Sequence, residues 1–220
     1  MKIKYTALIT AILVAISVII GLYYKSTYTD YKGLEDFSVA MMKEDTFDDI
    51  MQVIIPELGN SDVIVKVRCD EEFKFRYKCA SQRVTALEVY KGDTLKAGDT
   101  FEIIRDNSTI GDAADDLIGG MPIINMGFVN EMTVGKEYLV FLGKELNTYS
   151  NDRIYLTADY TIVPIFACDN VENIMDPTLT DGVIYTSYDR VSAAEFFVLS
   201  DNLQEKVWNY KQQIFNMYMK

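Results

Sequence analysis

A run of 20 residues without a charged side chain, Tyr5–Tyr24, lies close to the N-terminus. A helix of this length spans roughly 30 Å, which matches the hydrocarbon core of a bilayer. Ten of its residues are Leu, Ile or Val, and together they favour insertion by roughly 3 to 6 kcal/mol. Tyr5 at one end and Tyr23 and Tyr24 at the other stand where interfacial aromatic residues belong. The run therefore predicts a transmembrane helix.

A cleaved signal peptide and a buried core helix are the alternatives. A signal peptide has a shorter apolar stretch with a small-x-small cleavage site, and Ile19–Tyr24 offers no such site. A core helix normally has a polar face, which this run lacks. A short basic N-terminus ahead of a first helix usually stays inside. We therefore expect a single-pass signal-anchor, with residues 1–4 cytoplasmic, 25–33 as a tether and 34–220 outside the cytoplasm.

The remainder of the chain is strongly acidic. The whole chain carries a net charge of −12, to which Lys2, Lys4 and Lys25 contribute +3, so residues 26–220 carry −15. Nucleic acids and anionic membrane surfaces are bound through clustered Lys and Arg, so we exclude both as ligands of this region. Solubility alone explains the charge, and basic partners or cations are compatible with it. The length is sufficient for one domain with its own core.

Hydrophobic periodicity predicts a mainly β domain with flanking helices. Val63, Val65 and Val67 alternate with other residues at a period of two, which indicates a strand. Tyr138–Leu142 is a continuous apolar run between two glycines, and we expect it to be the most buried strand. Further strands are expected at 79–90, 101–105, 154–157, 161–166 and 183–186, and helices from Phe47 to Pro56 and at 112–118.

The order of three strands, a short helix and two strands is that of a small closed barrel of the OB type. Four segments also resemble a pattern of bacterial cell-surface domains, which are OB-like, similar to netrin or metalloproteinase-inhibitor modules, and largely uncharacterised. These segments are 61–65, 89–93, 96–99 and 134–142, within residues 61–166. The resemblance implies a fold and no functional residues, because the shared positions are turns and core.

A C-terminal amphipathic helix is expected from about residue 192. Ser192 and Glu195 have the spacing of a capping box. An apolar stripe follows at intervals of three or four residues: Phe196, Leu199, Leu203, Val207, Tyr210, Ile214 and Met217. The stripe packs on the barrel, or alternatively a partner such as a second copy covers it in a homodimer.

The chain contains no histidine, which removes Ser-His and Cys-His pairs and the usual zinc sites. It also lacks the glycine-rich motifs that bind nucleotide phosphates. We therefore predict no catalytic residue, no cofactor and no metal site. Asp106, Asp112, Asp115 and Asp116 lack the spacing of a calcium loop, and a capped helix explains them better.

Two features near one predicted hairpin have candidate roles. Cys69 and Cys79 face each other if the hairpin loop is 70–78, and a disulfide between them would be structural. With a tighter turn, Cys69 would face Phe73 instead. The loop also alternates aromatic and basic residues. We name Phe73, Phe75, Arg76 and Tyr77 as candidate ligand-binding residues, for an anionic glycan or a protein; a half-exposed strand is the alternative.

Three functions remain open. The first is a non-catalytic extracytoplasmic binding module with an unknown protein or glycan ligand. The second is a hydrolase of wall polymers that uses two carboxylates about 5 to 10 Å apart in a groove. The third is a structural module that dimerises through the C-terminal helix.

Overall fold

The computed structural model describes residues 2–27, 31, 33–76, 79–105, 117–118, 121–146, 152–169, 171, 179 and 184–219. The chain forms two compact units, Met1–Lys32 and Gly33–Lys220.

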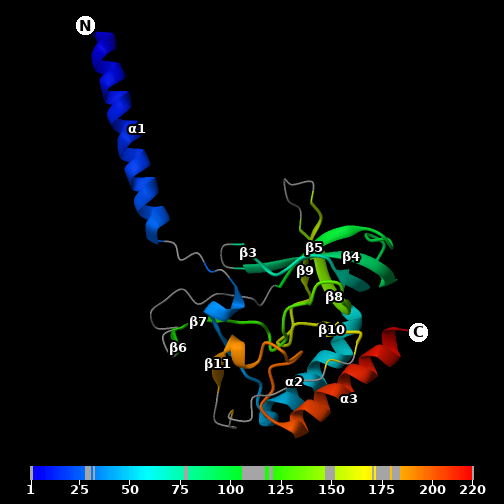
Figure 1. Cartoon of the computed structure of the whole chain (residues 1–220). Helices are drawn as coiled ribbons and strands as arrows, with labels where there is room; N and C mark the ends of the chain where they lie inside the picture. Colours follow the sequence, from blue (N-terminus) through cyan, green and yellow to red (C-terminus); the bar gives the residue numbers. More distant parts are fainter. Residues whose placement is uncertain are drawn as a thin grey trace. The chain divides into compact units, whose positions relative to one another are not determined.

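The first unit is the helix α1 (Lys2–Thr27), shown in dark blue in Figure 1. Its segment Tyr5–Ser26 is long and apolar enough to cross a membrane, and none of it is buried. The large apolar side chains of this segment are 47% to 67% exposed. The predicted apolar helix is therefore confirmed, and it is compatible with either a signal anchor or a signal peptide.

The second unit is built around a closed five-stranded barrel. Its strands are β2 (Val63–Cys69), β4 (Cys79–Lys91), β5 (Thr100–Ile104), β8 (Glu137–Glu145) and β9 (Ile154–Thr157). They pair in the order β8-β2-β4-β5-β9, and β9 also pairs with β8, which closes the barrel. The β5–β9 pair is parallel and the others are antiparallel. The predicted OB-type barrel is confirmed.

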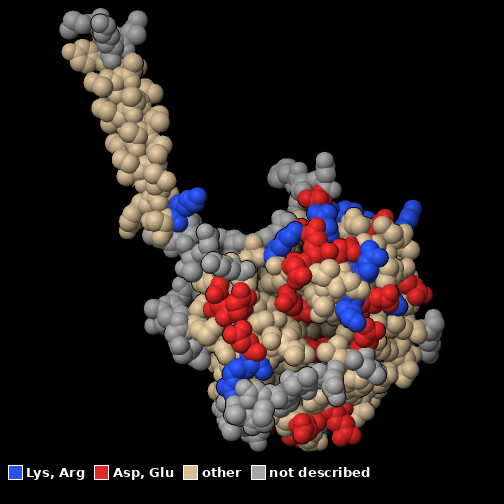
Figure 2. Space-filling model, in the orientation of Figure 1, with Lys and Arg blue, Asp and Glu red and all other residues tan. Residues whose placement is uncertain are grey.

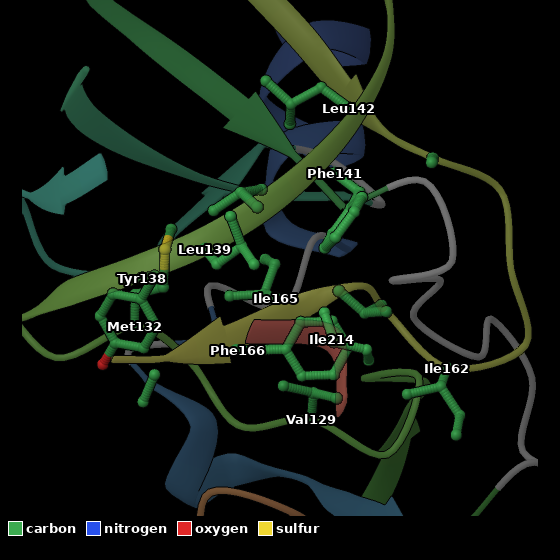
Figure 3. Close-up of a cluster of buried hydrophobic side chains, with 14 of the residues drawn as sticks. Val129, Met132, Tyr138, Leu139, Phe141, Leu142, Ile162, Ile165, Phe166 and Ile214 are labelled. Carbon is green, nitrogen blue, oxygen red and sulfur yellow. The ribbon is translucent and has the colours of Figure 1, made fainter. Parts of the chain in front are cut away.

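The strand β8 is the centre of the hydrophobic core, as its apolar run predicts. Leu139, Val140, Phe141 and Leu142 are all fully buried. The strand β10 (Ile165–Ala167) pairs with β8 along its edge, and the C-terminal helix α3 (Asp201–Tyr218) contributes side chains that pack on it. The ring of Phe141 lies 5.1 Å from that of Tyr218 and 6.1 Å from that of Phe166. Figure 3 shows this cluster, with Ile214 of α3 next to Phe166.

A smaller sheet has the order β11-β1-β7-β6. Its strands are β11 (Tyr185–Ser187), β1 (Ser38–Ala40), β7 (Met121–Ile124) and β6 (Leu117–Ile118). One face packs on the core, because Val39 and Ile124 are fully buried and Thr186 is nearly so. A helix was predicted at 112–118, but its last two residues form the strand β6. The first five residues of that range lie outside the described part of the chain.

Two helices pack beside the barrel. The helix α2 (Glu44–Glu57) includes Pro56 in its last turn and continues into a short 3-10 helix, Leu58–Asn60. It lies side by side with α3 (Figure 1). Two further 3-10 helices in the described part of the chain are Leu34–Asp36 and Tyr188–Arg190, and the short strand β3 (Lys74–Arg76) pairs with β4.

The C-terminal helix begins later than its sequence signal indicates. Its N-cap is Ser200, whose hydroxyl accepts a hydrogen bond from the backbone N–H of Leu203. The Ser192–Glu195 pattern does not cap it, because the Glu195 side chain points into the core and binds other groups. The stripe of this helix is covered by the same chain: Leu203, Val207 and Ile214 are buried, while Met217 is 46% exposed.

The predicted disulfide is not present, since Cys69, Cys79 and Cys168 are all thiols. The cause is the strand register: Cys69 pairs with Val84 in β4, while Cys79 pairs with Arg76 in β3. Five residues of an extended strand, about 16 Å, separate Val84 from Cys79, whereas a disulfide needs Cα atoms within about 7 Å. Cys69 instead points inward, where its thiol contacts the backbone oxygen of Met132.

Candidate binding groove

An open groove of about 640 Å³ lies between the small sheet, helix α2 and two loops of the second unit. Most of its lining is apolar or aromatic, which is typical of sites that bind ligands in proteins. The described residues that line it are Ala40, Val53, Ile54, Ile123, Asn125, Phe128, Asp159, Tyr160, Thr161 and Tyr185.

The floor of the groove is the outer face of the small sheet. Ala40 and Tyr185 are cross-strand partners, and Ser38 is the partner of Ile123. Because paired residues share a face and residues two apart do as well, Ala40, Ile123 and Tyr185 lie on one face. All three are half-buried, whereas Val39 and Ile124 on the opposite face are fully buried. The sheet therefore separates the core from the groove.

One wall is provided by α2 and the loop that follows β9. Val53 is 66% exposed, although its neighbour Ile54 is buried in the core. The hydroxyl of Tyr160 donates a hydrogen bond of 2.6 Å to the backbone oxygen of Glu57, at the end of α2. This contact joins the loop to the helix and fixes the distance between them.

The other wall contains a strained residue, Phe128, which has a φ of 60°. Non-glycine residues rarely adopt positive φ, and bulky ones do so at an energetic cost. Hydrogen bonds on both sides impose it: Gly127 accepts from the N–H of Val163 at 3.0 Å, and Phe128 accepts from the N–H of Phe197 at 2.9 Å. Asn125 Oδ1 also accepts from the N–H of Gly127 at 2.9 Å. Phe128 is thus held in place at the groove.

The described lining of the groove contains few polar groups, and the charge that it carries is negative. Of the described residues that line it, Asp159 is the only charged one, and Asn125 and Thr161 are neutral and polar. The nearby end of α2 adds the exposed Glu57. Figure 2 shows acidic side chains in several places on the visible face, interspersed with Lys and Arg. The groove can therefore accommodate apolar side chains, and the surrounding field favours a positively charged ligand.

No family model and no curated protein matches this sequence. The function must therefore be inferred from the geometry of the groove and of the other polar clusters.

Phe73 and Phe75, two of the candidate ligand-binding residues between β2 and β4, do not line the groove. Phe73 and Phe75 are half-buried, with their rings 5.4 Å apart. Phe75 packs at 5.3 Å on the buried ring of Phe37, and the guanidinium of Arg105 lies 5.9 Å from the ring of Phe73. Both aromatic side chains thus stabilise the loop against the core. The side chain of Arg76 and the whole of Tyr77 lie outside the described residues, and a role in ligand binding stays a prediction.

Arg105 is the centre of a buried polar cluster. Its guanidinium donates to the backbone oxygens of Val129, at 2.7 Å, and Asn130. Burial lowers the pKa of Arg105 to about 10 and raises the pKa of Glu131 nearby. The Tyr188 hydroxyl lies within hydrogen-bond distance of both Asn130 and Glu131. These contacts join β5, the loop after β7 and the 3-10 helix at Tyr188, so the cluster has a structural role.

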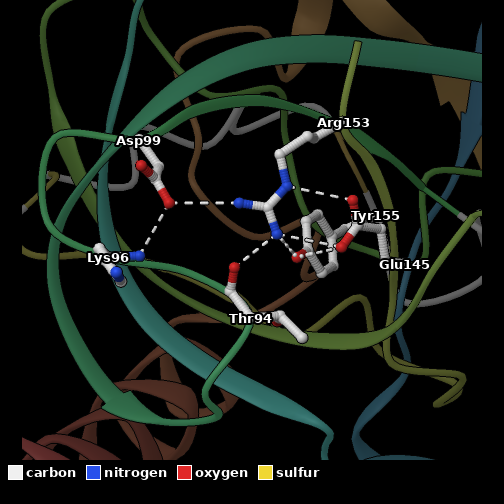
Figure 4. A network of polar contacts seen from close by, with 6 residues as sticks. All are labelled: Thr94, Lys96, Asp99, Glu145, Arg153 and Tyr155. Atoms are coloured by element: carbon white, nitrogen blue, oxygen red, sulfur yellow. Dashed lines mark hydrogen bonds and ion pairs between the residues drawn. The ribbon is translucent and has the colours of Figure 1, made fainter. Parts of the chain in front are cut away.

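A second polar cluster closes the barrel near the start of β9 (Figure 4). The guanidinium of Arg153 binds both carboxylate oxygens of Glu145, at 3.1 and 3.0 Å, and Asp99 at 3.2 Å. It also donates to the backbone oxygen of Thr94. The hydroxyl of Tyr155 lies 2.8 Å from Glu145. Hydrogen bonding to Arg153 lowers the pKa of Glu145, which keeps this carboxylate charged and paired.

Metal binding receives no support within the part of the chain that the structure describes, where no group of three His, Cys, Asp or Glu residues could hold an ion. The four aspartates considered for calcium, Asp106, Asp112, Asp115 and Asp116, lie outside that part.

The groove was not predicted from the sequence because its lining comes from five separate segments. One residue of the groove could have been noticed in the sequence. Val53 is an apolar residue outside the stripe formed by Phe47, Met51 and Ile54 on α2, so it had no core position to fill.

Proposed function

We propose that this chain is a membrane-anchored, extracytoplasmic binding module whose groove binds an apolar, positively charged segment of a partner protein. The observation that carries the proposal is the groove itself, with its apolar floor and walls and Asp159 as the only charge among its described lining residues. Apolar contact supplies the affinity, and the charge of −15 on residues 26–220 favours Lys or Arg in the partner.

The helix α1 supports the anchored location. It presents a continuous apolar surface of membrane-spanning length, with Lys25 in its last turn. The second unit forms a closed barrel, the fold expected from the resemblance to cell-surface OB-like domains. Together these features favour a domain displayed outside the cell and tethered by one helix.

The alternative functions have weaker support. A carboxylate-dependent hydrolase needs two acidic groups that flank a groove, and the described lining of this one includes only Asp159. A dimer through the C-terminal helix needs an exposed apolar stripe, whereas Leu203, Val207 and Ile214 are buried within the chain.

The binding proposal can be tested with a random 12-residue peptide library, displayed on phage and selected against the full chain in lipid nanodiscs. We expect enriched peptides to combine apolar residues with Lys or Arg. The variant Val53→Asn removes part of the groove wall, and we expect it to weaken the selected peptides about tenfold, since a buried valine contributes about 1.5 kcal/mol or more. The proposal fails if no peptide is enriched.

A matched control is Val134→Asn. Val134 is also exposed, at 41%, but lies in the turn before β8 and does not line the groove. We expect this variant to bind the selected peptides with unchanged affinity. Equal losses in the two variants would place the binding surface elsewhere.

The location is tested separately by adding protease to intact cells. We expect residues 34–220 to be digested from outside. Protection of this region, while other surface proteins are cut, would overturn the extracytoplasmic assignment.

A further inference from the structure

The strand β11 forms an edge of the small sheet, next to the groove. It pairs with β1 on one side, and within the described part of the chain no strand pairs with its other side. Exposed edge strands present unpaired backbone groups, and they are sites where another extended chain adds to a sheet.

The register of β11 shows which backbone groups face outward. The N–H of Met41 donates to the oxygen of Ile184 at 2.8 Å, and the N–H of Tyr188 donates to the oxygen of Phe37 at 3.0 Å. Residues 184, 186 and 188 therefore face β1. Because alternate residues of an antiparallel strand hydrogen-bond to opposite sides, the N–H and C=O groups of Tyr185 and the N–H group of Ser187 point to the open side. The carbonyl of Ser187 starts the 3-10 helix Tyr188–Arg190, of which Ser187 is the N-cap.

The same strand contributes to the groove. Tyr185 lies on the face formed with Ala40 and Ile123, which is the groove floor. A strand added beside β11 would lie about 4.8 Å away, and every second side chain would fall on that face. One extended segment would then pair with the backbone of β11 and place its side chains in the groove.

We infer that the partner segment binds as an added β-strand along β11, with alternate side chains in the groove. This inference rests on the proposed function and specifies its ligand as an extended peptide, with apolar residues at alternate positions and Lys or Arg among the others. A second copy of this chain is the less favoured occupant, because two domains that each carry −15 repel one another.

The most direct variant is Ser187→Pro, which removes the outward N–H of β11. The backbone of Ser187 already has a φ of −61°, close to the value that proline imposes. Proline is also tolerated on an edge strand whose N–H faces outward. We therefore expect the variant to stay folded and to bind the library-selected peptides about tenfold more weakly, because the peptide loses a hydrogen bond and keeps an unpaired carbonyl. The control Ser187→Ala retains the N–H and should bind normally.

Peptide N-methylation gives a second, independent measurement that needs no change in the protein. We synthesise a selected peptide with methyl groups on either of its two alternating sets of amides. Methylation of the set that faces β11 should abolish binding, and methylation of the other set should not.

The possible results separate the two proposals. If no peptide is enriched, or if Val53→Asn has no effect, the groove itself is not the binding site. If binding depends on Val53 but tolerates Ser187→Pro and both methylation patterns, the groove binds its partner without strand addition. A dimer of the full chain in nanodiscs that Ser187→Pro disrupts would assign the edge to a second copy and overturn the inference.

Discussion

The ammonium group of Lys211 lies 2.7 Å from a carboxylate oxygen of Glu195, and these side chains are only 1% and 5% exposed. Glu195 also accepts a 2.8 Å hydrogen bond from the backbone N–H of Ala167. The pair joins α3 to β10 and to the segment before the helix. Removing one partner of such a pair leaves an uncompensated charge in the core, whereas the intact pair adds little net stability.

We therefore expect Lys211→Met to lower the free energy of unfolding at pH 7 by about 3 to 5 kcal/mol. The measurement is guanidinium denaturation of the full chain in nanodiscs. A double variant, Lys211→Met with Glu195→Leu, should be more stable than the single one, because the buried charge is then absent. A loss below about 1 kcal/mol in the single variant would show that water reaches the pair.

The same variant should also acquire a characteristic pH dependence. Burial raises the pKa of Glu195 even beside Lys211, and loss of the lysine raises it further. A carboxyl group whose pKa is higher in the folded state binds its proton more tightly there, so folding becomes more favourable as the pH falls. The deficit of Lys211→Met should shrink between pH 7 and pH 5.5, and a constant deficit would show that Glu195 takes up no proton over this range.

Cys69 should be inert towards thiol reagents in the folded protein. Burial raises its pKa to about 12, so only about one molecule in ten thousand holds a thiolate at pH 8. We expect iodoacetamide to leave Cys69 unmodified in the native state and to alkylate it after denaturation, as measured by mass spectrometry. Recovery of a peptide that links Cys69 to Cys79 under non-reducing conditions would contradict the structure.

Gly127 and Gly98 provide a matched pair of substitutions by alanine. Both have positive φ, 56° and 91°, so both variants acquire backbone strain of about 1 kcal/mol. At Gly98 an added Cβ meets open space, but at Gly127 it would lie 2.4 Å from a methyl carbon of Val163 and 2.9 Å from its backbone nitrogen. We expect Gly127→Ala to lose at least about 2 kcal/mol more than Gly98→Ala in thermal or guanidinium unfolding. Similar losses would mean that the Val163 segment moves away easily.

We expect a lysine at position 153 to stabilise the folded chain less than Arg153 does. The guanidinium contacts both oxygens of Glu145, Asp99 and the backbone oxygen of Thr94 at once, and a lysine ammonium cannot match this planar geometry. Because the side chain is 31% exposed, we expect a loss of only about 1 kcal/mol. The measurement is the guanidinium midpoint, and a Lys variant equal to the native chain would show that charge alone suffices.

The sequence was sufficient to predict the elements whose pattern is local. The alternation at Val63–Val67 and the apolar run Tyr138–Leu142 each correspond to a barrel strand. Their order along the chain, three strands, a short helix and two strands, favoured the OB-type barrel.

Elements defined by long-range contacts were harder to predict. The Ser192–Glu195 pattern resembles a helix start, but the Glu195 side chain lies in the core, where it pairs with Lys211, 16 residues later in the chain. The cysteine bridge depended on the register of one hairpin, which β3 changes by pairing with β4. The groove depends on β1, a three-residue strand with no pattern of its own.

The position of β1 has a mechanical consequence. This strand lies between β11 and β7 in the small sheet, and it is the first strand after α1 along the chain. If the helix is held in a membrane while a partner pulls on β11, the tension runs through this sheet and bypasses the barrel. Under such tension the small sheet, and with it the proposed binding site, would deform before the barrel unfolds.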